Sequence, residues 1–242
     1  MQLYDTNLAG HWDAMSSASL TKDDLGKVSV WQDLKEKYDV KADAAHQPKY
    51  VENAINGFPA IDFSGSAIGL VSDVKFSKGP DSPFTWIMAV QPRETNEWHN
   101  IFSTSDANWA GLGKSYSYYP ISAASDGIHG WSTPSDVRDL ELSVDQLTIY
   151  TIWYDGTNAK IYWGKDLKAT NTPSNWNKGP TGYVAMGLGL QNRGHDYSGY
   201  IGEVLVYDVA LESEQLNETI DAMTKKWTTG ASWKKPGKFK MS

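Results

Sequence analysis

Cysteine is absent from this chain of 242 residues. Its absence excludes disulfide bonds, a thiol nucleophile, and zinc or iron–sulfur sites built on cysteine. Long apolar runs are also missing, since no stretch approaches the roughly 18 apolar residues that a membrane-spanning helix requires. The chain opens MQLYDTNLAG, which has neither the basic start nor the apolar run of a secretory signal, so we expect no signal peptide.

Positive charge is scarce over most of the chain. The formal net charge is −7, yet residues 225–242 contain six lysines and no acidic residue. The remainder is therefore strongly acidic, which argues against nucleic acid as the main partner because phosphate binding needs a basic surface. The basic end is a candidate docking segment through Lys234, Lys235, Lys238 and Lys240. The alternative is a solvated terminal tail.

Aromatic residues are abundant, with 11 Trp, 13 Tyr and 6 Phe against only 21% charged residues. This composition is typical of a folded protein. Turn-forming pairs such as Asn56-Gly57 and Asp155-Gly156 separate short runs rich in β-branched and aromatic residues, which predicts an all-β sandwich or jelly roll. The expected strands lie at 28–31, 60–63, 84–91, 100–104, 127–131, 146–154, 159–163, 183–191 and 200–207.

Two local patterns are the clearest. The run 147–154 carries apolar or aromatic side chains on both faces, so we expect both faces of that strand to be covered. Near the end, an apolar stripe at helical spacing predicts one helix, which begins at an N-cap Ser213, ends near Gly230 and covers one end of the sandwich. The stripe consists of Leu211, Leu216, Ile220, Met223 and Trp227. We expect one domain over residues 1–227 and a basic tail over residues 228–242.

A family resemblance rests on three stretches: LAGHWDAMSSASL…VSVWQDL (8–34), QPKYVENAINGFPAIDFSGSAIGL (47–70) and GYIGEVLVYDVALESEQLNETIDAMTKKW (199–227). In this order they resemble the laminin-G-like, concanavalin-A-like lectin/glucanase domains that recur in bacteriophage virion proteins and some bacterial surface proteins. The resemblance implies a two-sheet antiparallel jelly-roll sandwich in which the N-terminal segment pairs near the last strand. The residue pattern adds the C-terminal helix. A fold of this kind does not identify a function.

Catalytic motifs are not evident. Glucanases of this superfamily carry paired acids as Glu-x-Asp-x-x-Glu, a spacing that places nucleophile and acid on one face of a strand. Residues 141–145 read ELSVD and residues 203–208 read EVLVYD, and neither matches. Glu203 is the best single acid, and the alternative is a structural glutamate that bonds to backbone at a strand start. The chain also lacks a GxSxG elbow, so we expect no catalytic residues and no enzyme.

Metal-binding motifs are weak as well. None of the five histidines lies in a close metal spacing, and we expect no resident metal or cofactor. Calcium is the metal to consider, because laminin-G-like relatives often bind it through aspartate and backbone oxygens. Its candidate ligands are Asp62, Asp73 and Asp106.

Aromatic loops carry the strongest functional signal. Sugars present apolar C–H faces and a rim of hydroxyl groups, which aromatic rings flanked by polar side chains can match. The alternative is that these rings belong to the core or to an interface. The candidate glycan-binding residues are Trp98, His99, Trp109, Tyr116, Tyr118, Trp131, Asn192, Arg193 and His195.

Together these patterns predict a non-enzymatic structural protein on the exterior of a bacteriophage virion, made in the host cytoplasm, as a capsid-decorating, fibre or tail-tip component. We expect it to bind host-surface glycans weakly, with avidity from many copies. Its partners are then other virion proteins, with no nucleic acid and no membrane insertion, and an oligomer is compatible with this role. The alternatives are a polysaccharide-degrading glycoside hydrolase and a bacterial carbohydrate-binding module.

Overall fold

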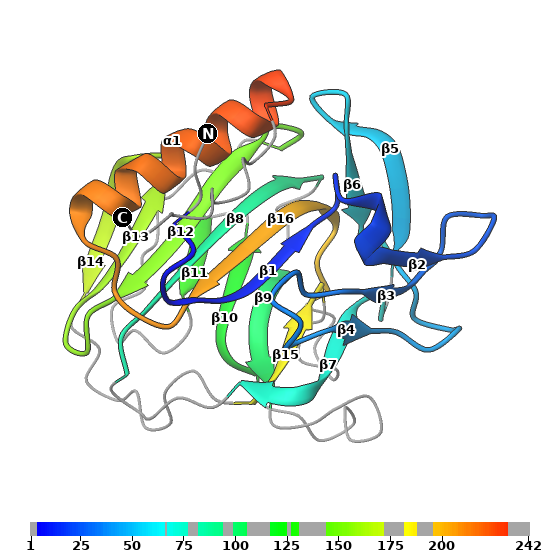
Figure 1. Cartoon of the computed structure of the whole chain (residues 1–242), viewed down its shortest axis with the longest axis horizontal. Helices are drawn as coiled ribbons and strands as arrows, with labels where there is room; N and C mark the ends of the chain where they lie inside the picture. Colours follow the sequence, from blue (N-terminus) through cyan, green and yellow to red (C-terminus); the bar gives the residue numbers. More distant parts are fainter. Residues whose placement is uncertain are drawn as a thin grey trace, which may run out of the picture.

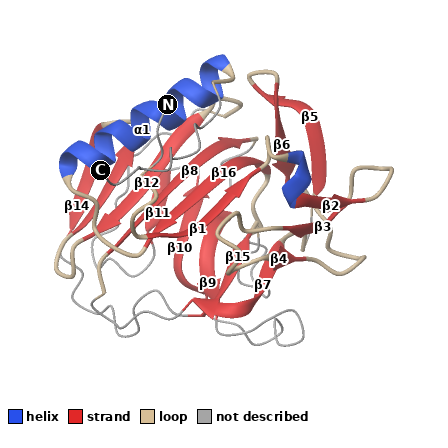
Figure 2. Cartoon of the chain, viewed as in Figure 1, coloured by secondary structure: helices blue, strands red, loops and turns tan. Residues whose placement is uncertain are grey.

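Two antiparallel sheets pack face to face in the computed structural model, and one long helix lies against the outside of the first sheet (Figures 1 and 2). The structure describes residues 4–65, 67–76, 82–93, 99–105, 117–124, 127–130, 144–171, 182–187 and 196–231. Within this part of the chain the two-sheet sandwich with a C-terminal helix is confirmed. No helix among these residues combines the length and the apolar character needed to cross a membrane.

Among the described residues, each sheet contains eight strands. In spatial order, the first contains β14 (Asp166–Asn171), β13 (Ala159–Trp163), β12 (Thr148–Tyr154), β8 (Phe84–Pro92), β16 (Gly199–Tyr207), β6 (Phe58–Asp62) and β5 (Lys49–Ile55), with β1 (Leu8–Asp13) also paired to β16. The second contains β11 (Gly127–Gly130), β10 (Ser117–Ala124), β9 (His99–Ser105), β15 (Gly182–Met186), β7 (Leu70–Phe76), β4 (Val40–Lys41), β3 (Val28–Trp31) and β2 (Leu20–Lys22).

The main core lies between the two sheets and is rich in aromatic rings. Trp12 and Trp86 of the first sheet both contact Phe102 of the second, with ring centroids 6.3 and 4.9 Å apart. All three side chains are buried. Rings of this size remove much apolar surface from water and add specific edge contacts, so they hold the sheets together.

A second apolar layer covers the outer face of the first sheet. Helix α1 (Ser213–Thr229) packs there on β8, β12 and β16, where Ile87, Ile149 and Leu205 are buried beneath it (Figure 1). The helix therefore covers a face of the sheet, and our expectation that it covers one end of the sandwich is wrong. The expected burial of both faces of the strand at 147–154 is confirmed, because Tyr150 lies in the main core and Ile149 in the helix layer.

The helix ends are set by local chemistry. Its N-cap is Glu212 rather than the predicted Ser213, because Glu212 and Gln215 form a reciprocal capping box. At the other end the predicted Gly230 is confirmed as the C-cap, in the left-handed conformation with φ 72°.

Strand β1 returns to the middle of the first sheet. It runs antiparallel to β16, with His11 opposite Leu205 and Asp13 opposite Glu203. The pairing confirms that the N-terminal segment lies beside the last strand. A bulge in β16 lies between Ile201 and Glu203, and it sets the direction of the side chains that follow.

Candidate functional site

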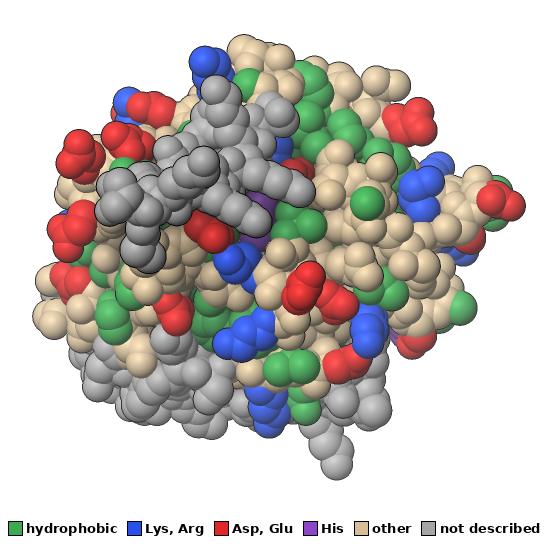
Figure 3. All heavy atoms as spheres, viewed as in Figure 1, with side chains coloured by type: hydrophobic (Ala, Val, Ile, Leu, Met, Phe, Trp, Pro, Cys, Tyr) green, Lys and Arg blue, Asp and Glu red, His purple; other side chains and the backbone are tan. Residues whose placement is uncertain are grey.

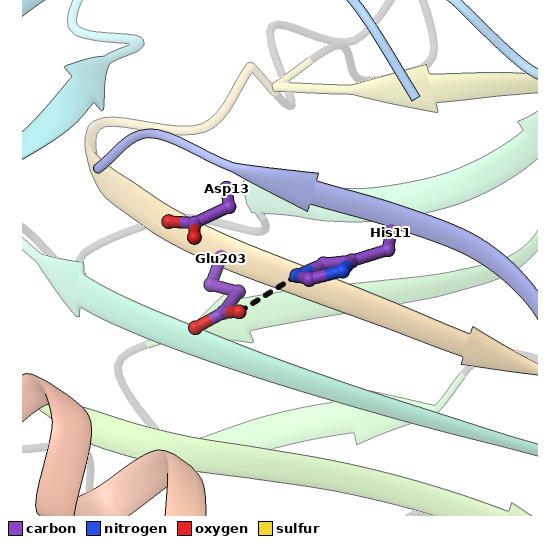
Figure 4. Close-up of side chains that lie close together, drawn as sticks. All are labelled: His11, Asp13 and Glu203. Atoms are coloured by element: carbon purple, nitrogen blue, oxygen red, sulfur yellow. Dashed lines mark hydrogen bonds and ion pairs between the residues drawn. The ribbon is translucent and has the colours of Figure 1, made fainter. Parts of the chain in front are cut away.

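Four ionisable side chains meet under the helix and are called here the buried ionic cluster: His11 and Asp13 of β1, Glu203 of β16 and Lys226 of α1. Figure 4 shows the first three of them. The Lys226 ammonium donates to Asp13 Oδ2 at 2.7 Å and lies 2.8 Å from Glu203 Oε2. His11 Nε2 lies 2.8 Å from Glu203 Oε1. The Trp227 indole N–H donates to Glu203 Oε2 at 2.8 Å. Glu203 and Lys226 are no more than 1% exposed.

Strand geometry explains why these groups meet. Alternation along β1 directs Trp12 into the main core and its neighbours His11 and Asp13 toward the helix. In β16 the bulge inserts Gly202 before Glu203, which places the carboxylate on the helix side. Lys226 lies in the last turn of the helix, and its side chain extends toward the sheet to contact Asp13.

The two carboxyl groups respond to this environment in opposite ways. Burial raises the pKa of Glu203, but the charges of Lys226 and His11 and their hydrogen bonds outweigh burial and lower it to about 2. The pKa of Asp13 is raised, first by burial and then by the charge of Glu203, and Lys226 offsets this only in part. Asp13 is therefore the carboxyl that takes up a proton more readily.

Acid is expected to weaken the fold through Glu203. A carboxyl whose pKa falls from an ordinary 4.5 to about 2 on folding stabilises the native state above the unfolded pKa and loses that contribution as pH falls through the folded pKa. Protonation of Asp13 acts in the opposite direction and offsets part of the loss. Between about pH 5 and about pH 2, we expect Glu203→Gln to lose up to about 3 kcal/mol less stability than the wild type. Urea denaturation at several pH values measures this, and parallel profiles would contradict it.

The cluster has the ligand types of a metal site. One ligand atom from each of His11, Asp13 and Glu203 lies within 4.8 Å of the others. Lys226, however, bridges Asp13 and Glu203 with its own positive charge, so the cation at this position is the ammonium. Glu203 was predicted either as an acid or as a strand-start glutamate bonded to backbone. It lies within β16 instead, where it contacts the side chains of His11, Trp227 and Lys226.

The structure separates the calcium candidates that it describes. Asp62 lies on β6 in the first sheet and forms an ion pair with Arg93 at 3.0 Å. Asp73 lies on β7 in the second sheet and forms an ion pair with Lys41 of the same sheet. Asp106 lies outside the described residues. The expectation about calcium therefore stays a prediction.

A polar pocket of about 410 Å³ opens beside the cluster. It lies between the segment after β1 and the loop that joins β3 to β4. Its walls are Ser16, Ala18, Ser19, Gln32, Asp33, Leu34, Glu36 and Asp39. The backbone amide of His11 donates to Asp33 Oδ1 at 2.7 Å, so pocket and cluster share the same segment of β1.

The loop that forms one wall is tied down by a single carboxylate. Asp33 is 2% exposed, and its oxygens accept the backbone amides of His11, Lys35, Lys37 and Tyr38. Its own amide donates to Asp39 Oδ1 at 2.9 Å. Glu36 sits at the exposed turn with φ 59°, a left-handed conformation that is uncommon for glutamate. These hydrogen bonds therefore preorganise this wall of the pocket in the absence of a ligand.

The predicted glycan-binding residues are described only in small part. His99 and Tyr118 lie on the neighbouring strands β9 and β10, which pair. The other seven, and the four lysines of the predicted docking segment, lie outside the described residues. The pocket at 16–39 was not predicted, although the sequence DLKEKYD offers three acids and no apolar alternation there.

Acidic and basic side chains are interspersed on the face of the molecule in Figure 3. This face shows no continuous basic surface among the described residues. The expectation that nucleic acid is not a partner stays a prediction.

Comparison with known proteins places this geometry in a family. Over residues 64–217 the sequence matches a family model, that of the concanavalin A-like lectin/glucanases superfamily. Among solved structures, Trypanosoma rangeli sialidase with 2,3-difluorosialic acid is 12% identical, with a TM-score of 0.66 over 92% of this chain and 34% of that chain. Domain 4 of AbnA, a GH43 extracellular arabinanase from Geobacillus stearothermophilus in complex with arabinotriose, is 15% identical, with a TM-score of 0.56 over 88% of this chain and 98% of that chain.

These likenesses have limits. The chain spans about a third of the length of the sialidase chains, and identities this low show the fold alone. No curated protein matches the sequence significantly. The family match covers well over half of the chain and agrees with the two-sheet architecture. The chain belongs to the concanavalin A-like lectin/glucanase superfamily.

Proposed function

We propose that the protein binds carbohydrate and does not cleave it. The observation that carries the proposal is the polar pocket, a preformed hollow of about 410 Å³ on a fold shared with carbohydrate-active proteins. Its volume lies within the range of small-molecule sites, about 300–1,000 Å³. The arabinanase domain was solved with arabinotriose, which supports a role for such sandwiches in holding sugars.

The pocket walls have the chemistry that a sugar requires. Hydroxyl groups of a sugar can find donors and acceptors in the side chains of Ser16, Gln32 and the exposed Glu36. Leu34, whose side chain is 41% exposed, offers an apolar surface for a C–H face. A rigid wall lowers the entropy cost of ordering these groups when the ligand binds.

The burial and the bonding partners of the described carboxyl groups support binding without hydrolysis. A glycosidase needs one carboxyl that donates a proton and a second at a defined separation in an open cleft. In the described part of the chain, Asp13 and Glu203 lie close together but are buried and bound to Lys226. Asp33 in the pocket is occupied by backbone amides. Hydrolysis would depend on Glu36 and Asp39, and release of reducing ends from a bound glycan would support that alternative.

Substitutions in the pocket are expected to weaken glycan binding without loss of stability. A glycan array, with the protein displayed multivalently and with or without calcium, identifies the ligand. Glu36→Gln and Gln32→Ala are each expected to weaken binding of that ligand by about tenfold or more, the effect of losing a hydrogen bond to a charged or amide group. The melting temperature stays unchanged because both side chains are exposed.

The matched control is Glu52→Gln, an exposed glutamate on β5 away from the pocket, which leaves affinity unchanged. Trp109→Ala and Trp131→Ala test the aromatic loops predicted from the sequence. If these rings control binding and the pocket variants do not, the pocket is not the site. A blank array overturns the proposal.

The proposal includes a place on the exterior of a bacteriophage particle, beside other virion proteins. This part rests on the sequence resemblance alone. Labelling of purified particles with an antibody to the chain tests it, and particles that never carry the protein would refute it. The bacterial carbohydrate-binding module is then the remaining setting for the same binding activity.

A further inference from the structure

The buried ionic cluster places an amine against a carboxyl group, away from the protein surface. Lys226 Nζ lies 2.7 Å from Asp13 Oδ2, and their side chains are 2% and 11% exposed. Glu203, fully buried, lies 2.8 Å from the same nitrogen. The Trp227 ring closes the site over Gly202, where even an added Cβ would lie 2.3 Å from the ring. An amine and a carboxyl group held in contact in a buried site are the reactants of an amide.

We propose that Lys226 and Asp13 condense into an intramolecular isopeptide bond, with Glu203 as the group that relays the proton. The proposal is independent of the carbohydrate-binding proposal, because it uses none of the side chains that offer donors or acceptors in the polar pocket.

The first step is a proton transfer within the ion pair. Ionised groups are costly to hold away from water, and a neutral amine beside a neutral carboxylic acid lowers that cost. The proton moves from Lys226 Nζ to Asp13 Oδ2 along their hydrogen bond. The raised pKa of Asp13 favours this direction. Lysine becomes a nucleophile when it loses its proton in a desolvated site.

The amine then adds to the carboxyl carbon of Asp13. A C–N bond forms, and an electron pair of the C=O bond moves onto Oδ1, which already accepts the backbone amide of Met15 at 2.9 Å. That donor stabilises the developing oxyanion. Glu203 accepts the proton released by the attacking nitrogen and delivers it to the hydroxyl at Asp13 Oδ2. It is placed for this relay because Lys226 Nζ lies 2.8 Å from Glu203 Oε2 and 2.7 Å from Asp13 Oδ2.

Collapse of this intermediate completes the reaction. The electron pair on Oδ1 re-forms the C=O bond, the C–Oδ2 bond breaks, and water leaves past Asp13, the more exposed partner. One amide and one water are produced from one amine and one acid, without oxidant, reductant or cofactor. His11 holds Glu203 from the far side at 2.8 Å, so His11 is a positioning residue.

The bond has a plain structural consequence. It would join the first strand of the first sheet to the last helix, between residues 213 positions apart. Because the amide carries no charge, the acid sensitivity of Glu203 described above belongs to the unlinked chain and becomes smaller in the linked one.

The test is the intact mass of the purified full-length protein. We expect the wild type to be lighter than its sequence by one water molecule, and digestion to yield a joined peptide that contains both Asp13 and Lys226. Lys226→Arg, which keeps the positive charge, has the mass of its sequence. Glu203→Gln is expected to leave the chain mostly unlinked.

Asp13→Asn separates this chemistry from any other loss of water. The same attack on a carboxamide expels ammonia, so this variant is expected to lose ammonia in place of water. Circular dichroism shows which variants are folded, and the wild-type mass decides the question even if a variant fails to fold. A wild type with the mass of its sequence overturns the proposal, as does a loss of water that persists in Lys226→Arg.

Discussion

Replacing Lys226 with methionine is expected to lower the free energy of unfolding by about 3–5 kcal/mol. The change removes the ammonium that lies between Asp13 and Glu203 and leaves two buried carboxyl groups without their shared partner. Loss of one member of a buried ion pair costs more than the pair contributes, because the remaining charge is desolvated. Urea denaturation near neutral pH measures the loss.

Lys225→Met is the matched control for this experiment. Lys225 is the preceding residue on the same helix, but it is exposed, so the same substitution is expected to change stability by no more than about 0.5 kcal/mol. Equal effects at the two positions would contradict the role of the cluster. If the isopeptide bond forms, Lys226→Met also removes a cross-link, and the loss becomes larger rather than smaller.

Gly202→Ala is expected to cost about 3 kcal/mol, the upper end of the usual range for overpacking. A methyl group at this position would lie 2.3–2.7 Å from three atoms of the Trp227 ring. The ring cannot turn away freely, because its indole N–H is bonded to Glu203. Thermal or urea denaturation measures the cost.

A double-mutant cycle assigns that cost to the ring. In a Trp227→Leu background the added methyl group meets a smaller side chain, so Gly202→Ala is expected to cost less there than in the wild type. An equal cost in both backgrounds would mean that the bulge itself, and not the packing against Trp227, requires glycine.

Much of the fold is predictable from the sequence, because regular strands have recognisable local sequence patterns. The strands expected at 28–31 and 159–163 coincide with β3 and β13, and the hairpin turn at Asp155-Gly156 is confirmed with Gly156 at φ 99°. The strand at 84–91 matches β8 to within one residue. These segments combine β-branched or aromatic residues with clear turn signals, and both features are local.

Other strands are not predicted, for a physical reason. Strand β1 reads LAGHWD and β5 reads KYVENAI, and their polar residues hide the alternation that marks a strand. In β1 two of these polar residues, His11 and Asp13, belong to the cluster. Their burial depends on partners supplied by β16 and α1, which a local pattern does not contain.

The site was missed for the same reason, although two signals were present. Glu203 is the charged residue in the otherwise apolar run IGEVLVY, and Lys226 falls inside the helical stripe between Met223 and Trp227. A charged residue at a core position rarely lies there without a partner of opposite charge. Each of these two residues therefore indicated that a partner of opposite charge lies nearby. Nothing in the sequence says which acid and which base meet.

The junction of β1 and α1 also decides how the molecule would respond to a pulling force. Tension applied at its two ends would pass along β1 to Asp13 and along the end of α1 to Lys226 before it reached the rest of the sandwich, since these two side chains are in contact. While that contact held, the 212 positions between them would carry no load. An ionic contact would slip under such tension, whereas a covalent one would make the whole sandwich inextensible.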